Sequence, residues 1–176
     1  MLKGEVIILR PVEESDLETY HRLQLDVEVR GEWFPREVSS FVSLKKEFEE
    51  NGFWGEKFGR LLMIDNASSA IIGEILFFTT VEYMNEMEIG YIVYDTSARK
   101  KGATSEALNL LTEYLFDLKQ INRIRLVIAT DNAASRRVAE KCGYTHEGTM
   151  REPWFIRGRH IDGELYAITR SDLSAD

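Results

Sequence analysis

A basic, glycine-containing turn lies in the middle of the chain, between an apolar run and an amphipathic segment. The run is Met87-Glu88-Ile89-Gly90-Tyr91-Ile92-Val93-Tyr94, whose β-branched and aromatic residues favour a strand. The segment from about Ser105 to Leu118 predicts a helix, because leucines recur at the 3, 4, 3 spacing of one apolar face: Leu108, Leu111, Leu115 and Leu118. A helix of this kind needs a sheet to cover, so the pattern indicates a layered fold of helices and strands.

The turn itself, Arg99-Lys100-Lys101-Gly102-Ala103-Thr104-Ser105, has the features of an anion-binding site. The start of a helix leaves its first N–H groups unpaired and carries partial positive charge. Gly102 lets a ligand approach the backbone closely, and the three small residues after it leave those N–H groups accessible. It is neither a Walker loop nor a Gly-x-Gly-x-x-Gly turn. An ordinary capped turn is the alternative interpretation.

Charge is unevenly distributed along the chain. The net charge of −8 weighs against nucleic acid or an anionic membrane as the main partner. Residues 1–96 carry a net charge of −10, residues 97–141 carry +4, and residues 142–176 carry −2. A basic island in an acidic chain suits an anionic ligand bound beside a cationic or amine substrate. The alternative is a solvated basic face that balances acidic helices.

The remaining pattern predicts one α+β domain over residues 1–176, with a mixed sheet and helices on both of its faces. A helix is expected after a capping box at Ser15 and Glu18, and a short helix over Ser135 to Lys141 is expected to be capped by Asn132. The other predicted elements are a helix over residues 43–50, a hairpin from 61–64 and 70–78, and strands over 6–9, 124–128, 145–150 and 165–170.

Several classes of protein are excluded by the composition. One cysteine, Cys142, excludes internal disulfides and a multi-cysteine zinc site, and three scattered histidines predict no metal site. No apolar run approaches the roughly 20 residues of a membrane span. The first residues turn acidic too soon for a signal peptide. We therefore expect a cytoplasmic protein that binds neither a membrane nor nucleic acid.

Motifs around and after the turn carry a resemblance to a known family. Arg99 to Ala103 fit the pattern Arg/Gln-x-x-Gly-x-Gly/Ala, which Thr104 breaks only at its last position. With this turn, the chain resembles the GNAT superfamily of acetyl-CoA-dependent N-acetyltransferases over nearly its whole length. The stretches that resemble the Rim-type protein N-terminal acetyltransferases are Asn132-Ala133-Ala134-Ser135, Glu140 to Gly148, and Ile161 to Ile168.

The resemblance implies the GNAT fold, a mostly antiparallel sheet in which a central parallel pair of strands splays apart around acetyl-CoA. The pantetheine arm would pair with the backbone of one strand, and the pyrophosphate would lie on the N–H groups of the turn. Asn132 would contact the pantetheine or an ordered water. The predicted acetyl-CoA residues are Ile92, Val93, Tyr94, Arg99, Lys100, Lys101, Gly102, Ala103, Thr104, Ser105 and Asn132.

The resemblance also implies direct attack of a neutral amine on the thioester. Many members place a tyrosine acid where this chain has Ala139, whereas Ser135 matches the Rim-type serine that would donate a hydrogen bond to the departing sulfur. Hydrogen bonding at the helix start is the alternative role of Ser135. Cys142 is predicted to be a small packing residue and not a nucleophile.

The general base is less clearly indicated. The Rim-type glutamate position holds Trp154 in this chain, with Glu152 close by, and Glu88 is expected to face the cleft from the central strand. A structural or solvated role is the alternative for each carboxylate, and the amine proton can leave through water.

The expected acceptor is a primary amine, either the N-terminus of a protein or peptide or a small molecule, and a homodimer is left open. One alternative is an antibiotic or polyamine acetyltransferase of the same fold. The other is a non-catalytic sensor that binds acyl-CoA, which Ala139 and Trp154 keep open because they replace two usual catalytic residues.

Overall fold

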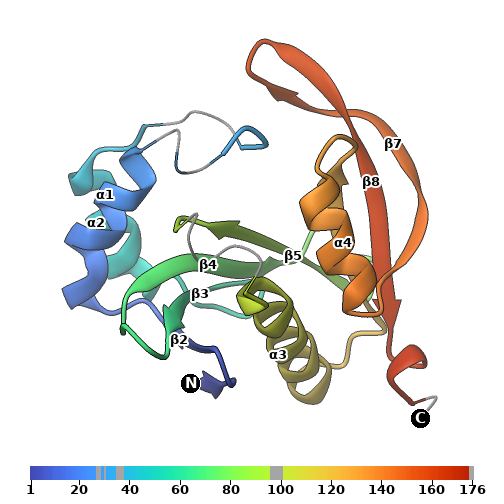
Figure 1. Cartoon of the computed structure of the whole chain (residues 1–176), viewed down its shortest axis with the longest axis horizontal. Helices are drawn as coiled ribbons and strands as arrows, with labels where there is room; N and C mark the ends of the chain where they lie inside the picture. Colours follow the sequence, from blue (N-terminus) through green and yellow to red (C-terminus); the bar gives the residue numbers. More distant parts are fainter. Residues whose placement is uncertain (27–28, 30, 35–37, 96–100, 175–176) are drawn as a thin grey trace.

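The computed structural model describes residues 1–26, 29, 31–34, 38–95 and 101–174. These residues build one sheet with the strand order β1-β2-β3-β4-β5-β6-β8-β7 (Figure 1). The strands are β1 (Leu2–Lys3), β2 (Ile7–Pro11), β3 (Phe58–Asp65), β4 (Ile71–Phe78), β5 (Glu86–Val93), β6 (Arg123–Ala129), β7 (Thr145–Ile156) and β8 (Arg159–Thr169).

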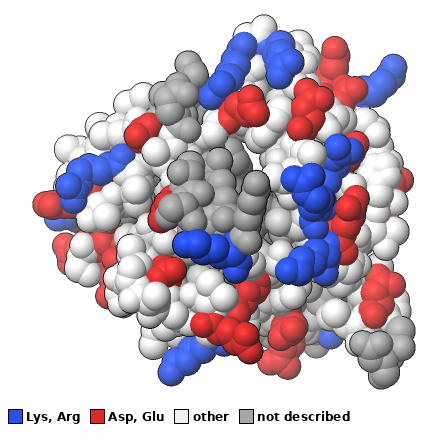
Figure 2. All heavy atoms as spheres, in the orientation of Figure 1, with Lys and Arg blue, Asp and Glu red and all other residues white. Residues whose placement is uncertain are grey.

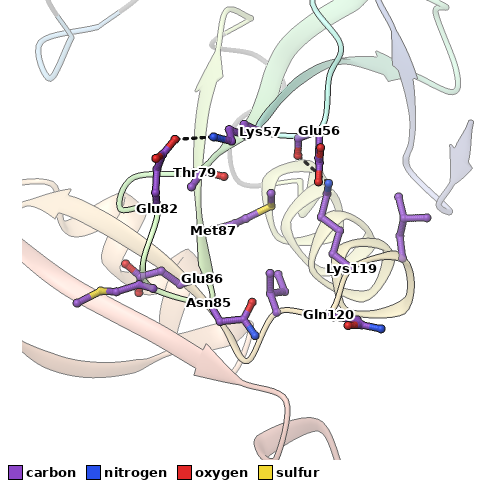
Figure 3. A pocket seen from close by; sticks show the side chains of 12 residues that line it. Glu56, Lys57, Thr79, Glu82, Asn85, Glu86, Met87, Lys119 and Gln120 are labelled. Carbon is purple, nitrogen blue, oxygen red and sulfur yellow. Dashed lines mark hydrogen bonds and ion pairs between the residues drawn. The ribbon is translucent and has the colours of Figure 1, made fainter.

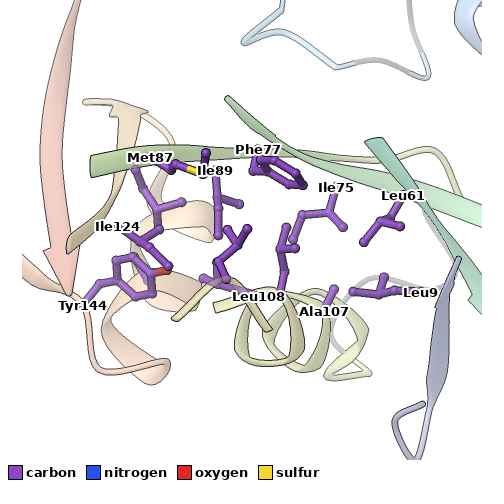
Figure 4. Close-up of a cluster of buried hydrophobic side chains, with 14 of the residues drawn as sticks. Leu9, Leu61, Ile75, Phe77, Met87, Ile89, Ala107, Leu108, Ile124 and Tyr144 are labelled. Atoms are coloured by element: carbon purple, nitrogen blue, oxygen red, sulfur yellow. The ribbon is translucent and has the colours of Figure 1, made fainter. Parts of the chain in front are cut away.

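Helices cover both faces of the sheet, as the sequence predicts. On one face, α3 (Ala103–Leu118) and α4 (Ala133–Lys141) cover the larger apolar core, which Figure 4 shows between α3 and the strands. On the other face, α1 (Leu17–Leu25) and α2 (Phe41–Asn51) pack over a smaller core. Figure 1 shows this second pair at the side of the molecule away from the β7–β8 hairpin. The expected α+β class is therefore confirmed.

The centre of the sheet holds a short parallel pair, formed by β5 and β6. Their register pairs Glu86 with Arg123, Met87 with Ile124, and Glu88 with Arg125, and no later residue of the two strands is paired across this edge. The strands nevertheless continue to Val93 and Ala129. Because they continue without pairing, they diverge toward their C-terminal ends. This is the splayed pair that the resemblance implied, and it leaves one edge of β5 open.

The predicted apolar stripe of α3 is correct except at its end. Leu108, Leu111 and Leu115 are fully buried, whereas Leu118 is 59% exposed. Leu118 is the last residue of α3, and Lys119 caps the helix through its N–H to the Leu115 carbonyl oxygen. The helix therefore ends with Leu118 on the surface, so the prediction that it packs against the sheet is wrong.

The capping box before α1 is also displaced from its predicted position. The Asp16 carboxylate accepts the Glu13 N–H at 2.8 Å and is held by the Arg10 guanidinium at 2.6 and 2.8 Å. This box closes the 3-10 turn Glu14–Asp16, and α1 follows directly from Leu17. The prediction that Ser15 caps the helix is therefore wrong, because the arginine fork holds Asp16 where it satisfies the earlier backbone N–H.

The β7–β8 hairpin is much longer than the sequence analysis predicts. The two strands run on to Ile156 and back from Arg159, with a turn at Arg157 and Gly158, and the register shifts between Met150 and Trp154. Most side chains of β7 are exposed on both faces, so this segment lacks the apolar alternation that identifies a strand. The far half of the hairpin extends beyond the last pair of β6 with β8, which joins Ala129 to Gly163 (Figure 1).

Candidate active site

After β5 ends at Val93, the next helix is α3, which begins at Ala103. Gly102 is its N-cap, with φ at +89°, and the Glu106 N–H makes the first helical bond to the Gly102 carbonyl at 2.9 Å. The preceding N–H groups of Ala103, Thr104 and Ser105 therefore begin the helix, where a ligand can accept them. Lys101 is exposed beside them. Of the predicted pyrophosphate site, Arg99 and Lys100 lie outside the described residues.

A carboxylate that the sequence analysis missed anchors this helix start. Glu106 accepts the backbone N–H groups of Glu5, Val6 and Ile7 at 2.6, 2.9 and 2.8 Å, from almost one hundred residues away. A Cβ at Gly4 would lie 2.3 Å from the Glu106 carboxyl carbon. The first turn of α3 is thus fixed to the sheet edge, which holds its N–H groups in place. An acidic residue in a first helical turn is a weak signal, because it also suits the helix dipole.

The end of β5 presents backbone groups along its open edge. Ile92 and Tyr94 have buried side chains, and the Tyr94 N–H bonds to the Ile72 carbonyl at 2.9 Å on the β4 side. The opposite edge, toward β6, has no strand partner beyond Glu88 within the described part of the sheet. An extended ligand that lies in this opening can take hydrogen bonds from the strand as another strand would.

The start of α4 lies at the end of β6, at the same end of the sheet as the start of α3. Asn132 caps α4, since its side-chain oxygen accepts the Ser135 N–H at 3.1 Å, which confirms the predicted cap. Two helix N-termini thus meet the open end of the parallel pair, and each favours an anion there. Lys and Arg gather over α4 in Figure 2, and the helix contributes Arg136, Arg137 and Lys141.

The Ser135 hydroxyl contacts a tyrosine that the sequence analysis did not single out. Its Oγ lies 2.5 Å from the hydroxyl oxygen of Tyr91, which comes from β5. Tyr91 packs against the core on the face that α3 and α4 cover, and both residues are partly exposed. Burial of the hydroxyl raises the pKa of Tyr91 to about 12. Only the alternation of β5 hinted at this contact, because it puts residues 87, 89 and 91 on one face.

Cys142 lies between the two helices. It is the C-cap of α4, and its thiol donates to the Ser105 carbonyl of α3 at 3.4 Å. Burial raises the pKa of the thiol, so the reactive thiolate is disfavoured. These contacts agree with the packing role predicted from the sequence.

The opposite face of β5 carries ionised groups. Arg125 forms ion pairs with Glu88 at 2.9 Å and with Glu86 at 3.1 Å. Arg123 also pairs with Glu86, at 3.2 Å, and with Glu147, at 2.5 Å. Burial raises the pKa of Glu88, which Arg125 partly opposes. Since Glu88 and Arg125 are the last paired residues of β5 and β6, this carboxylate stands where the two strands part.

The second predicted base, Glu152, lies far from Glu88. It is exposed on β7, at the register shift, and its N–H donates to Asp162 at 2.8 Å. Asp162 lies five residues along β8 from Ala167, which is level with Arg125. Five strand residues span roughly 15 Å. The fold therefore separates the two carboxylates along the sheet.

Two tryptophan side chains pack at the far half of the β7–β8 hairpin. Trp33 and Trp154 pack with Ala129, Ile156 and Ile161 in a small cluster. The Arg157 guanidinium also donates to the Gly31 carbonyl at 3.3 Å, so the hairpin and the segment before α2 touch. Trp154 occupies the position where the resemblance places a base, and its indole has no proton-accepting group.

A hollow of about 620 Å³ lies at the other end of β5, beside the last residues of α3 (Figure 3). Two contacts lie at its rim. Lys57 forms an ion pair with Glu82, and the Lys119 amine donates to the Glu56 carbonyl oxygen. Its lining comes from the N-terminal end of β5, away from the start of α3, so it is separate from the predicted site.

Within the ranges described above, no three His, Cys, Asp or Glu side chains gather as a metal ion would require. In the same ranges, every helix is too short or too polar to cross a bilayer.

Comparison with known proteins decides the family. The family model described as an acetyltransferase (GNAT) domain matches residues 7–145. The chain belongs to the GNAT acetyltransferase family. The expected superfamily is thereby confirmed, and with it a transferase that uses acetyl-CoA as the acyl donor.

Relatives include enzymes of both expected acceptor classes. Spermidine N(1)-acetyltransferase of Vibrio cholerae is 25% identical over 165 residues, which cover 94% of each chain. Ribosomal-protein-serine acetyltransferase of Escherichia coli is 27% identical over 136 residues, covering 76% of this chain and 74% of that one.

Solved structures support the same fold. The Vibrio cholerae spermidine N-acetyltransferase with CoA and spermine has a TM-score of 0.83 at 24% identity, over 96% of this chain and 98% of that one. Mycobacterium smegmatis RimJ with a CoA-disulfide has a TM-score of 0.78 at 22% identity, over 95% and 83%. The predicted GNAT fold is therefore confirmed.

Proposed function

We propose that this GNAT enzyme transfers the acetyl group of acetyl-CoA to a primary amine by direct attack, with acetyl-CoA in the opening between β5 and β6. The observation that carries the proposal is the register of this pair, which ends at Glu88 and Arg125 while both strands continue. An edge without a strand partner beside two helix N-termini suits an extended arm that ends in phosphates.

The acyl donor spans this opening. Its pantetheine arm pairs with the open edge of β5, and its pyrophosphate lies on the first N–H groups of α3. The capping oxygen of Asn132 is already used, so its amide N–H groups remain for the arm or a water. The residues assigned to the donor are Ile92, Val93, Tyr94, Arg99, Lys100, Lys101, Gly102, Ala103, Thr104, Ser105 and Asn132.

The amine approaches from the face that carries Glu88. Its neutral nitrogen attacks the thioester carbon, and the C–N bond forms as the C–S bond breaks. The developing charge on the carbonyl oxygen is stabilised by a backbone N–H near Val93. Glu88 takes the proton that the nitrogen loses, because burial makes this carboxylate more basic than a solvated one. Glu152 remains the second candidate base, and its distance from Glu88 makes the two easy to tell apart by mutation.

Ser135 acts on the leaving group. Asn132 caps α4, so the Ser135 hydroxyl is not needed as the cap and can donate to the sulfur. A hydroxyl is a poor acid, and its role is a hydrogen bond that strengthens as negative charge gathers on the sulfur.

A polyamine is favoured as the acceptor over other small amines by two observations. Residues 1–96 carry a net charge of −10, which attracts a polycation. The spermidine acetyltransferase relative also covers almost the whole chain. The N-terminus of a basic peptide is the second candidate, in keeping with the ribosomal-protein relative.

The test is CoA release from acetyl-CoA with spermidine, spermine, basic peptides with free N-termini, the same peptides blocked, and an aminoglycoside. We expect turnover with a polyamine or a free peptide N-terminus and none with the blocked peptides. Acetyl-CoA that binds tightly but is not consumed with any amine would make the chain a sensor. Turnover confined to the aminoglycoside would make it an antibiotic-modifying enzyme.

Two further proposals concern the cell. A cytoplasmic location stays a prediction from the sequence, which fractionation of cells that produce the chain tests. The homodimer stays a prediction that light scattering of the purified chain tests directly.

A further inference from the structure

In this chain, the helix position where many GNAT enzymes have a tyrosine acid holds an alanine. Ala139 of α4 is fully buried and has no proton to donate. One helical turn earlier, the Ser135 hydroxyl meets Tyr91, a tyrosine that comes from the strand and not from the helix. A phenol hydroxyl is therefore present beside α4 although the helix itself lacks one.

The geometry of the two hydroxyls leaves one hydrogen to spare. The oxygens are 2.5 Å apart, so one O–H of the pair forms the bond between them, whichever oxygen donates it. The Tyr91 oxygen also lies 3.5 Å from the Ser135 carbonyl, at the limit of a hydrogen bond. The second O–H of the pair can thus point away, and both residues are partly exposed.

We propose that Tyr91 is a positioning residue for acetyl transfer, whose hydroxyl holds the Ser135 hydroxyl so that the pair presents one O–H to the sulfur that leaves as CoA thiolate. The proposal rests on the proposed function of Ser135. It assigns to a strand residue the place that a helix residue holds in relatives with a tyrosine acid.

The step balances without loss of either hydroxyl proton. The amine forms the C–N bond, its proton passes to Glu88 and then to water, and the electron pair of the C–S bond stays on sulfur. The thiolate accepts a hydrogen bond from the pair and takes its proton from water. Tyr91 remains neutral throughout, because burial holds its hydroxyl in the protonated form at neutral pH. Neither hydroxyl therefore has to regain a proton between turnovers.

A second tyrosine provides a matched control. Tyr144 is buried in the same core and shares a hydroxyl–hydroxyl bond of 2.7 Å with Thr112 of α3. Tyr144→Phe and Tyr91→Phe each remove one such bond and leave the ring in place. If Tyr91 only stabilises the fold, the two variants should behave alike in catalysis.

The experiment measures kcat, the KM for acetyl-CoA and the melting temperature for the wild type, Tyr91→Phe, Ser135→Ala, the double variant and Tyr144→Phe. We expect Tyr91→Phe to lower kcat about fivefold, as the loss of one neutral hydrogen bond does, with KM unchanged within about twofold. The double variant should match Ser135→Ala, because Tyr91 acts through Ser135. Tyr144→Phe should keep the wild-type kcat.

Two results overturn the role of Tyr91. One is a normal kcat for Tyr91→Phe, and the other is a double variant in which the two losses multiply. A wild-type chain that acetylates no amine at all would instead reject the proposed function, so the two failures are distinct.

Discussion

On its helix-covered face β5 offers Tyr91, a neutral hydroxyl that meets Ser135, whereas on its open face it offers Glu88, a carboxylate paired with Arg125. The residues lie three apart on one strand, and alternation sends them to opposite faces. The first side contains uncharged hydroxyls and a thiol with a raised pKa, and the second contains an ion-pair network.

This difference matches the two charge problems of acetyl transfer. The leaving sulfur gains negative charge, and neutral donors stabilise it without the cost of burying a cation. The attacking amine gains positive charge, and a carboxylate both attracts it and removes its proton. On the proposed mechanism, the two faces of β5 therefore serve the attacking amine and the leaving sulfur separately, and each role can be tested from its own side.

The largest effect should follow from the open face. Glu88→Gln removes the proposed base and keeps the size of the side chain, with one oxygen left to accept from Arg125. We expect kcat to fall about a hundredfold or more, the range of general base catalysis. In the wild type, kcat should fall as the pH drops through a Glu88 pKa that is raised above its ordinary value, and the variant should lose this dependence.

Glu152→Gln is the matched control for this comparison. It makes the same substitution at an exposed carboxylate roughly 15 Å away, and turnover should stay within about twofold of the wild type. If steady-state kinetics show the opposite ranking of the two variants, the amine is deprotonated from the hairpin and not from β5.

The next largest effect on kcat is expected on the face of β5 that α3 and α4 cover. Ser135→Ala should lower kcat about tenfold to a hundredfold with the affinity for acetyl-CoA little changed, since the hydrogen bond strengthens only in the transition state. Ser40→Ala is a suitable control, because Ser40 caps α2 and its loss should cost about 1 kcal/mol of stability without a change in turnover. A stable Ser135→Ala enzyme with normal turnover would remove Ser135 from the mechanism.

A substitution at the proposed pyrophosphate site should change the affinity for acetyl-CoA. Gly102→Val places a branched side chain where the pyrophosphate is expected, and the affinity for acetyl-CoA should fall tenfold or more, or about 1.4 kcal/mol, by calorimetry. Gly158→Val is a close control, because both glycines have a positive φ and open space around the Cβ position. Equal affinities for the two folded variants would refute the pyrophosphate site.

The smallest effect is expected at Cys142. Direct transfer needs no acetyl-enzyme, so Cys142→Ala should retain most of its turnover and lose only some packing between α3 and α4. An inactive but folded variant would show that the thiol takes part in the chemistry.

Local patterns predicted the elements of the fold well. The leucine stripe of α3, the hairpin of β3 and β4, and the Asn132 cap of α4 all depend on residues close in sequence, where periodicity and capping act. The exceptions also have local causes. Arg10 forms an ion pair with Asp16, which displaces the expected capping box. The side chains of β7 are exposed on both faces, so the strand lacks the apolar alternation that predicts a strand.

The site was predicted less completely, because its contacts join distant segments. Tyr91 and Ser135 are 44 residues apart, and Glu106 holds backbone groups about 100 residues away. The resemblance named Ser135 and Glu88, but it carried no information on the tyrosine that meets the first or the arginine that meets the second. Such pairs depend on strand register and on the faces of the sheet, which the sequence alone does not define.

The central claim is direct transfer across β5, and rapid-quench mass spectrometry of the intact protein and the products tests it. With acetyl-CoA alone, the account predicts no acetylated protein and no burst of free CoA. After spermidine or a peptide amine is added, CoA and acetylated amine should appear in equal amounts and at the same rate. An acetylated Cys142 that forms and decays at the turnover rate, or CoA released before the amine is added, would contradict it.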